Sequence, residues 1–273
     1  MDGIDFVPRT FGTPQYRVCP EHTDQIEAQL ASGSHLKDAA YRIRYEAYNS
    51  YGFVPQRQNG IFSDAYDERS NCQTALVFKH GVAAATIRIA SYDPESFNTD
   101  YHFVQAMEIF EAEIKSALGQ LRPGGRKPRA VEIGKLARLP GYAKDLDILF
   151  ALFRAVGYLI LNRDVDVVFN AVRSHHMPTY RRFGFRQLEA PRQYPGLTFK
   201  TGLMACFRTS YDQARNNLPF LRGISTDDAA YHGLIAGERV PIFGAAAAPI
   251  SAGHQPGSSD RPSQTPDALH NRA

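Results

Sequence analysis

The chain has 273 residues, which is long enough for one large domain or two small ones. Its 31 basic and 28 acidic residues leave a formal net charge of only +3, which excludes a strongly polybasic protein, and we expect no nucleic-acid partner. No apolar run approaches the roughly 20 residues that span a bilayer, so we expect no transmembrane segment. Three widely spaced cysteines and the absence of a signal-peptide pattern indicate a reduced, cytoplasmic protein without a disulfide framework.

The first quarter of the chain begins with an arm and continues into a helix. We expect an extended arm over residues 1–14, a short strand at 16–19 and a short helix over 24–31. Ser34 is a candidate N-cap for the next helix. There Leu36, Ala40, Ile43 and Ala47 recur at helical spacing and form a buried face, with Arg44 at its border and Tyr48 one turn further on.

A loop, a hairpin and a second helix follow. Residues 52–70 are rich in turn-forming residues and predict a loop. Two β-rich runs at 74–79 and 82–92, joined by His80-Gly81, predict a hairpin. Apolar residues at helical spacing predict an amphipathic helix: Phe103, Met107, Phe110, Ile114 and Leu118. Residues 122–129 form a basic, turn-rich loop.

The stretch from 129 to 144 predicts a strand that breaks at Pro140-Gly141 and leads into an apolar helix. A helix start after a glycine turn presents backbone N–H groups and a positive dipole end to an anion. Three residues there fit the pattern R-x-x-G-x-A: Arg138, Gly141 and Ala143. Glu132 lies six residues upstream, so we expect the carboxylate and the turn to lie along one groove.

The remaining elements complete an α/β plan with one mixed sheet. The apolar run 165–172 predicts a strand that is buried on both faces. We expect a short helix over 175–184 that ends at Gly184, strands at 185–188 and 197–207, and short helices within 211–240. From residue 244 onward the composition predicts a disordered tail.

Three segments, taken in chain order, resemble those of the GNAT acyltransferase fold. They are the strand–RLPGYA–helix unit, the VDVVFNAV strand and the YRRFGF segment (180–185). That fold has a phosphate-binding pattern of Q/R-x-x-G-x-G/A. The resemblance implies an arm and first strand over 1–34, a GNAT-like domain over 35–210, a helical extension over 211–243 and the tail over 244–273. It also implies a mixed central sheet flanked by helices.

Within that fold, the chain is most similar to the autoinducer-synthase-like branch, which contains N-acyl amino acid synthases and acyl-homoserine lactone synthases. The residues that carry this likeness are YRIRYEAYNSYGF with Arg44 and Tyr48, D-x-x-D at Asp64 and Asp67, Arg88, and E-x-x-K/R at Glu132 and Lys135. Lys135 stands where arginine is common, and no tryptophan follows the first helix. These departures favour the N-acyl amino acid synthases.

The resemblance implies attack of an amine on the thioester of a phosphopantetheine-linked acyl donor, with Glu132 as general base. The alternative is that Glu132 forms a structural ion pair with Lys135, Arg88 or Arg44. Backbone N–H groups at a bulge of the central strand would hold the oxyanion. Tyr180 stands where many GNAT enzymes keep a general acid for the departing thiol; the alternative is a tyrosine packed at a helix end.

Donor and acceptor sites follow from the same resemblance. Cofactor binding is implied for Arg138, Gly141, Ala143 and Lys144, and acceptor binding for Arg44, Tyr48, Asp64, Asp67, Arg88 and Lys135. The alternatives are an ordinary turn glycine, surface salt bridges and core aromatic packing. The basic loop, with Arg126, Lys127 and Arg129, could meet acidic acyl carrier protein or be simply solvated. Adjacent His175 and His176 lack a third ligand, so we expect no metal.

The reading that combines these features is an N-acyltransferase that moves a long-chain acyl group from acyl carrier protein to the amine of an amino acid. Three alternatives remain open from the sequence. They are an acetyl-CoA- or acyl-CoA-dependent GNAT enzyme, an acyl-homoserine lactone synthase that uses S-adenosylmethionine, and a non-catalytic acyl-binding module on the same scaffold.

Overall fold

The computed structural model describes residues 26–194 and 197–243. The predicted arm over 1–14, the strand at 16–19 and the disordered tail from 244 lie outside the described residues. The strands are β1 Ile26–Leu30, β2 Cys72–Lys79, β3 Val82–Tyr92, β4 Ala130–Arg138, β5 Val167–Val172, β6 Arg186–Gln187, β7 Arg192–Gln193, β8 Lys200–Phe207 and β9 Val240–Pro241. The α-helices are α2 Ser34–Asn49, α3 Met107–Gly119, α4 Leu146–Arg163, α5 Met177–Arg182, α6 Arg208–Asn217 and α7 Ala229–Ile235.

The strands form one mixed sheet, as the sequence predicts. Within the described residues the sheet runs in the order β6-β8-β5-β4-β3-β2-β1-β9, and β7 pairs with β8 beside this path. Among these strands only β4 and β5 pair in parallel; the other neighbours are antiparallel. A parallel pair needs a crossover connection, and α4 supplies it between β4 and β5.

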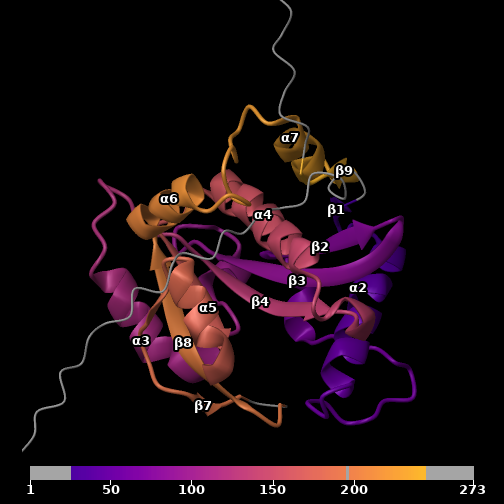
Figure 1. Cartoon of the computed structure of the whole chain (residues 1–273). Coiled ribbons are helices and arrows are strands. Elements are labelled where there is room, and N and C mark those ends of the chain that lie inside the picture. The colour runs from indigo at the N-terminus through magenta and orange to yellow at the C-terminus, as the bar shows by residue number, and fades with distance from the viewer. Residues whose placement is uncertain (1–25, 195–196, 244–273) are drawn as a thin grey trace, which may run out of the picture.

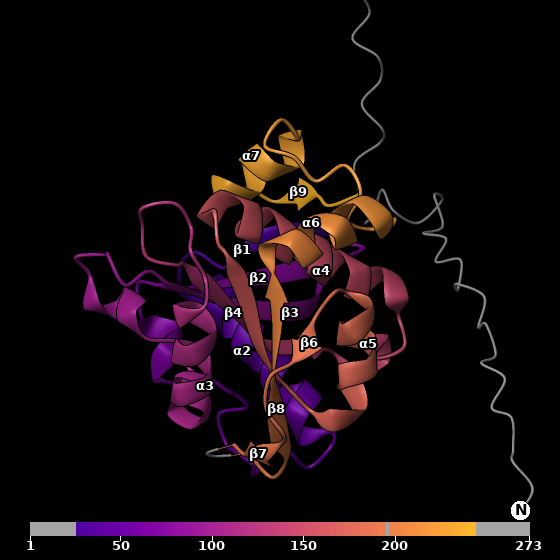
Figure 2. The same cartoon turned by 90° about the vertical axis from the view of Figure 1, so that its left-hand side faces the viewer.

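Helices cover both faces of the sheet (Figures 1 and 2). On one face α4 packs along β1, β2, β3 and β4 within the largest hydrophobic cluster, which also includes residues of α5, α6 and α7. On the other face lie α2, in a cluster with Leu76, Phe78 and Ala137, and α3, in a cluster with Ala130 and Phe169. The sheet therefore separates an α4 face from an α2–α3 face, and this division positions the functional residues.

The predicted hairpin is confirmed. β3 spans Val82–Tyr92 and pairs antiparallel with β2. The turn between them has positive φ at both residues, 50° at His80 and 81° at Gly81. This backbone matches the right-handed twist of the flanking strands.

The helix predicted over 24–31 is wrong, because this segment forms the strand β1 and pairs antiparallel with β2. Ile26, Ala28 and Leu30 are buried, and Glu27 and Gln29 between them are partly exposed. That alternation has the period of a half-buried strand. The spacing of Ile26 and Leu30 fits a helix as well, and pairing with β2 decides between the two.

Several predicted boundaries also move. Gly33, not Ser34, occupies the N-cap of α2, and no side chain caps that end. Phe103 precedes α3, which begins at Met107. The last long strand begins at Lys200 rather than at 197. Gly184, with φ 87°, closes the α5 segment as predicted.

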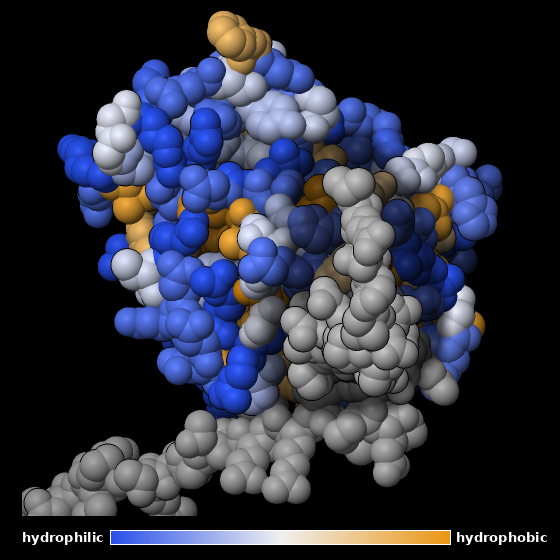
Figure 3. Space-filling model, turned by 90° about the horizontal axis from the view of Figure 1, so that it is seen from above, coloured by the Kyte–Doolittle hydropathy of each residue, from blue (hydrophilic) through white to orange (hydrophobic). Residues whose placement is uncertain are grey.

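The outer surface is mostly polar where it can be seen. On the described part of the face shown in Figure 3, hydrophobic residues form only small, separate spots. None of the helices in the described residues combines the length and the apolar character needed to cross a bilayer.

Candidate active site

A β-bulge in β4 determines which side chains reach the α2–α3 face. Arg88 lies opposite Gly134 and Thr86 lies opposite Ala137, so two residues of β4 face the single residue between them on β3. Lys135, in the bulge, has a positive φ of 53°. Regular alternation would point residues 132 and 135 to opposite faces. The bulge instead places Lys135 on the same face as Glu132, so it makes the E-x-x-K spacing usable in a strand.

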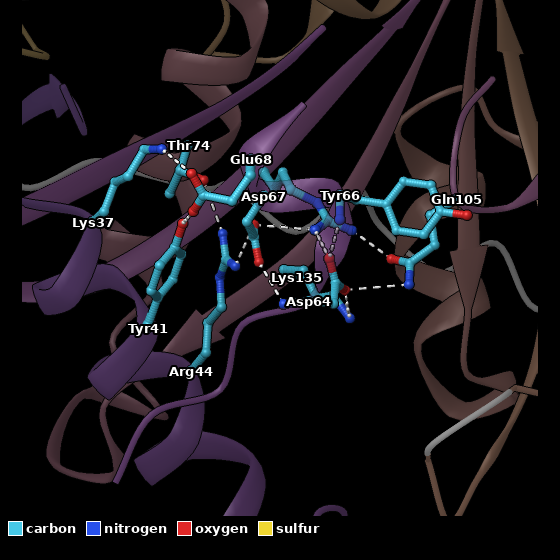
Figure 4. A network of polar contacts seen from close by, with 11 residues as sticks. Lys37, Tyr41, Arg44, Asp64, Tyr66, Asp67, Glu68, Thr74, Gln105 and Lys135 are labelled. Carbon is cyan, nitrogen blue, oxygen red and sulfur yellow. Dashed lines mark hydrogen bonds and ion pairs between the residues drawn. The ribbon is translucent and has the colours of Figure 1, made fainter. Parts of the chain in front are cut away.

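Five charged side chains pair with one another on this face, between α2 and the start of α3, and form what we name the charge cluster: Arg44, Asp64, Asp67, Arg88 and Lys135. Figure 4 shows this network. Arg44 is fully buried rather than at the border of its helix face as predicted. Its Nη1 donates to Asp67 Oδ1 at 2.7 Å and its Nη2 to Thr74 Oγ1 at 2.9 Å. Arg88 Nη1 donates to Asp67 Oδ1 at 3.0 Å, so one carboxylate oxygen joins two guanidinium groups.

Asp64 completes the charge cluster from the loop. It accepts from Arg88 Nη1 at 2.6 Å and pairs with Lys135 Nζ at 2.9 Å. The D-x-x-D spacing forms a reciprocal cap on a 3₁₀ turn, because Asp64 Oδ1 accepts from Tyr66 N and Asp67 Oδ2 accepts from Asp64 N. The two aspartates therefore fix their own loop and bind the cations together. This geometry excludes the surface-salt-bridge alternative for Asp67 and Arg88, which are buried.

The cations keep both aspartates ionised. Burial alone would raise the pKa of Asp64, but Lys135 and Arg88 hold it well below its usual range. Burial opposes ionisation of Asp67 as well, and the guanidinium groups of Arg44 and Arg88 lower its pKa. Burial lowers the pKa of Lys135, and its pairing with Asp64 only partly offsets this. The aspartates thus serve as fixed negative charges rather than as proton acceptors.

Glu132 is the exception among the carboxylates of this face. It is 4% exposed, and its Oε2 accepts from Ala106 N at 2.8 Å. It forms no ion pair with the described cations, which argues against the structural ion-pair alternative. Burial raises its pKa. Its Oε1 has no hydrogen-bond partner in the described residues, and a Cβ built on Gly134 would meet only this atom, at 3.6 Å.

β4 and β5 part directly beyond Glu132. Their pairing ends at Ile133 and Asn170, yet β4 continues to Arg138 against β3 and β5 continues to Val172 against β8. Arg173 follows β5, and its guanidinium lies 4.3 Å from the Phe53 ring centroid and 5.1 Å from that of Phe199. Tyr48 packs against the same two rings. This observation fits the core-packing alternative for Tyr48, at the edge of the site.

The predicted phosphate turn lies at the far end of β4, and most of its donors already have partners. Asp145 caps α4 by accepting from the N–H groups of Asp147 and Ile148, and it pairs with Lys79 at 2.6 Å. Arg138 Nη1 donates to the Asp145 carbonyl at 2.8 Å. The helix start is therefore not the set of free N–H groups that the sequence suggested.

What remains open at the turn is the surface beside Gly141. Gly141 and Lys144 are exposed, Ala143 is half-buried, and no atom lies within 4 Å of a Cβ built on Gly141. Arg173 Nη2 lies 2.9 Å from His176 Nε2. Burial and the charges of His175, Arg173 and Arg138 lower the pKa of His176 to about 4. Arg138 and Arg173 each use one guanidinium nitrogen in these contacts, and their remaining N–H groups are candidate anion ligands beside Gly141.

Glu132 and Arg138 do not share one groove on one face, which corrects the prediction. Glu132 lies against the residues that precede α3, whereas Arg138 contacts the start of α4. Tyr180 is also on the α4 side, where it packs against Phe153 and its hydroxyl contacts Asn170. A ligand that touched both faces would have to cross the sheet where β4 and β5 part.

The basic loop offers fewer free charges than predicted. Arg126 forms a two-pronged pair with Asp166, at 2.6 and 3.0 Å, and Arg129 pairs with Asp93 at 3.1 Å. These arginines therefore hold the loop against the strand ends. The structure does not support them as freely available ligands for a carrier protein.

Comparisons with known proteins identify the family of the chain. A family model described as N-acyl amino acid synthase FeeM matches residues 39–206, which is more than half of the chain. The chain belongs to the N-acyl amino acid synthase family. As a member of this family it is an N-acyltransferase, and the GNAT-like mixed α/β fold is the one predicted.

Among solved structures, the synthase is similar to FeeM, an N-acyl amino acid synthase from uncultured soil microbes. The TM-score is 0.55 at 18% identity, over 73% of this chain and 98% of that chain. It also matches the acyl-homoserine lactone synthase LasI, with TM-score 0.48 at 15% identity over 66% and 88% of the two chains. The CoA-dependent acyl-homoserine lactone synthase BjaI gives TM-score 0.47 at 15% identity over 77% and 97%. A search of curated proteins gave no match.

Sequence reasoning missed several residues that shape the synthase site. Gln105 accepts from Arg88 Nη2 and donates from its Nε2 to Asp64 Oδ2 at 3.2 Å. Thr74 accepts a hydrogen bond from Arg44, and the Ala106 amide donates one to Glu132. None of these lies in a recognisable motif, and only the fold brings them to the charge cluster.

No cluster of three or more metal-ligating side chains is present in the described part of the chain.

Proposed function

We propose that the protein transfers a long-chain fatty acyl group from acyl carrier protein to the amine of an amino acid. The family assignment supports an N-acyltransferase. The single observation that supports the chemistry best is Glu132, a buried carboxylate with a raised pKa and one oxygen without a partner in the described residues. A cytoplasmic location and carrier-protein partnership belong to this proposal.

Glu132 acts as general base. The amine of an amino acid is protonated at neutral pH and cannot attack a carbonyl until it loses a proton. A carboxylate in water is too weak a base for this task, and burial brings its pKa closer to the working pH. Asp64 and Asp67 cannot replace it, because their pKa values are lowered by the cations around them.

The reaction makes one bond and breaks one. The neutral amine attacks the thioester carbon, and a C–N bond forms. The carbonyl oxygen becomes an oxyanion beside the β4 bulge, where the extra residue leaves backbone N–H groups outside the regular ladder. The nitrogen then loses a second proton, the C–S bond breaks, and the thiolate takes up one proton and leaves as a thiol. The proton that Glu132 took from the ammonium is released to solvent.

The donor approaches from the α4 face. Arg138, Lys144 and the open surface at Gly141 bind the phosphate of phosphopantetheine, and Arg173 and His176 lie beside them. The pantetheine arm then reaches Glu132 through the region where β4 and β5 part. Tyr180 lies on the donor's side of the sheet, and burial raises its pKa to about 12, so it stays protonated and can serve as the acid for the thiolate.

Mass spectrometry of reaction mixtures tests the proposal. Purified protein is incubated with each of the twenty L-amino acids and with palmitoyl carrier protein, palmitoyl-CoA or acetyl-CoA. We expect an N-palmitoyl amino acid, formed faster from the carrier protein. Turnover with acetyl-CoA alone would contradict the long-chain reading, and a lactone product from S-adenosylmethionine would assign the chain to the other branch.

A further inference from the structure

A small cavity lies on the α4 face, next to the point where β4 and β5 part. Its volume is about 30 Å³, and its lining is mostly apolar, with Ile133 of β4, Val168 of β5 and Phe153 of α4 among the residues. Ile133 belongs to the last residue pair between β4 and β5. It also follows Glu132 directly, and successive side chains of a strand point to opposite faces. The cavity therefore reaches the strand position that carries Glu132, on the other side of the sheet.

The chain after α6 supplies another part of the lining, through Phe220 and Leu221. The Phe220 ring centroid lies 5.5 Å from that of Phe183 and 6.4 Å from that of Phe153, and both of these residues also line the cavity. This segment lies beyond residue 206, where the match to the family model ends. The cavity is thus bounded on one side by the matched domain and on another by the extension.

The extension packs closely on α4 (Figures 1 and 2). The Tyr211 hydroxyl donates to the Gly157 carbonyl at 3.0 Å, and a Cβ built on Gly157 would meet Ile224 Cδ1 at 2.6 Å. Between α6 and α7, however, residues 218–228 form no helix or strand. Phe220 and Leu221 therefore lie in the part of the lining that shifts at the lowest cost, because β4, β5 and α4 are central elements of the fold.

The acyl chain of the proposed donor needs an apolar space beside this opening, because a fatty chain left in water is unfavourable. A thioester is planar, so an amine that attacks from the α2–α3 face leaves both the pantetheine arm and the acyl chain on the α4 face. The cavity at Ile133 is an apolar space on that face. Its volume is only about that of one water molecule in the liquid, so a longer chain has to displace side chains of the lining.

We propose that this cavity is the acyl-chain site and that Phe220 and Leu221 form its end wall, which sets the acyl length that the enzyme prefers. This inference rests on the proposed function and names residues that select the acyl group of its donor. Protein interiors are close-packed, so each carbon that extends past the end wall has to displace an atom of it. Smaller residues at these two positions accommodate longer chains.

Three variants test the end wall. Phe220→Ala removes a whole ring, Leu221→Ala removes a smaller group, and Ala214→Leu adds bulk to the same lining. The kcat/KM is measured for a series of saturated acyl carrier proteins from octanoyl to stearoyl, with the best of the twenty L-amino acids. We expect the preferred chain to lengthen by about four carbons in Phe220→Ala and about two in Leu221→Ala, and to shorten by about two in Ala214→Leu.

Phe78→Ala is the matched control, because it removes the same ring from the cluster beside α2 on the other face of the sheet. It should leave the preferred length unchanged. If Phe220→Ala does not fold, the opposite shifts expected of Leu221→Ala and Ala214→Leu decide the matter. If the folded variants keep the chain-length preference of the unaltered protein, the end wall is overturned and the proposed function stands. If the unaltered protein transfers none of these acyl groups to any of the twenty amino acids, the proposed function fails together with this inference.

Discussion

Two kinds of carboxylate stand within one site, and their surroundings decide what each can do. Asp67 contacts two guanidinium groups, so its charge is balanced in the buried state. Glu132 receives one backbone N–H group and no cation, so burial dominates its pKa. An acid–base role requires a group whose protonated and ionised forms are both accessible near the working pH. Of these two residues, only Glu132 has a pKa that is shifted upward, in the direction that this role requires.

We expect Glu132→Gln to lower kcat at least 100-fold, because an amide cannot accept the proton of the amine. The fold should persist, since a glutamine oxygen can still accept from the Ala106 N–H group. Glu111→Gln, on the exposed side of α3, is the control and should be fully active. Ionised Glu132 is the active form, and its pKa is raised. The pH below which kcat/KM falls should therefore be higher than the usual pKa of a glutamate.

Equal activity of Glu132→Gln and the unaltered protein would place the base elsewhere. Thermal unfolding distinguishes loss of chemistry from loss of fold. A raised folded-state pKa means that ionising Glu132 costs stability as pH rises through that pKa. The glutamine variant avoids this cost, so its Tm at pH 8 should be no lower than that of the unaltered protein.

For Asp67 we expect the opposite dependence of stability on pH. Its folded-state pKa is lowered, so it contributes stability above its unfolded pKa, whose usual value is 3.8, and that contribution disappears as pH falls through the folded value. Asp67→Asn leaves Arg44 and Arg88 buried without this carboxylate, and we expect a loss of about 3–5 kcal/mol in the free energy of unfolding at pH 7. Denaturant titration measures it, and the difference should shrink below pH 4.

The neighbouring Glu68 provides the comparison for Asp67. It pairs with Lys37 on the surface, where such pairs contribute about 0–1 kcal/mol. Glu68→Gln should therefore change the unfolding free energy by less than about 1 kcal/mol. Similar losses of unfolding free energy in the two variants would show that the buried ion pairs of Asp67 contribute no more than the surface pair of Glu68.

At the scale of helices and strands, the sequence pattern predicted correctly those elements that form through contacts between residues close together in the chain. The β2–β3 hairpin was predictable because its turn residues and both strands lie within one short stretch. β1 was not, because two apolar residues four apart suit a helix until pairing with β2 imposes a period of two. The site motifs were visible as charged residues in apolar surroundings. Their partners Gln105 and Ala106 were not, since only tertiary contacts bring them there.

The bulge in β4 is the clearest case of structure that the residue pattern does not reveal. A single lysine with positive φ shifts the alternation, so that Leu136 joins the α4 face and Ala137 the α2 face. Such a conformation costs a residue with a side chain roughly 1–2 kcal/mol. Strain of this kind persists where the surroundings over-determine it, and here the bond to Asp64 holds Lys135 in place.

This strain predicts an unusual order of stability for two variants. Lys135→Gly and Lys135→Ala both remove the ammonium group, but only glycine adopts a positive φ without steric cost. We expect the glycine variant to be more stable than the alanine variant by about 1 kcal/mol in denaturant titration. In a regular strand glycine would be the less stable of the two. An alanine variant of equal or higher stability would show that the left-handed conformation is not retained.

At the scale of the whole molecule, the sheet itself separates the two groups of residues to which the proposed function assigns the substrates. The proposed acceptor residues lie on the α2–α3 face and the proposed donor residues on the α4 face, so in the proposed reaction the acyl transfer takes place where β4 and β5 part. Neither face holds the complete set. This arrangement explains why residues only six apart in β4, Glu132 and Arg138, serve different ligands in the proposed reaction.

The chain after α6 is joined to the α4 face by a buried polar network. Arg154 of α4 donates to the carbonyls of Phe220 and Arg222, at 3.1 and 2.9 Å, and Tyr158 donates to Asp228. Phe220 stacks on Phe150, with ring centroids 4.4 Å apart. β9 then pairs with β1 at the end of the sheet. The division into a domain over 35–210 and an extension over 211–243 stays a prediction that this network makes testable.

Tyr158→Phe tests whether the extension unfolds separately. Loss of the hydroxyl leaves Asp228 and Arg154 without one buried partner each, and we expect a cost of about 1–3 kcal/mol. If the extension is a separate unit, hydrogen exchange should accelerate in α7 and β9 and stay unchanged in β3 and β4, with acyl transfer unaffected. If exchange accelerates equally in all four elements, the extension and the sheet form one cooperative unit, and the predicted boundary at 210 is wrong. Tyr231→Phe, which removes an exposed hydroxyl on α7, should leave exchange unchanged in either case.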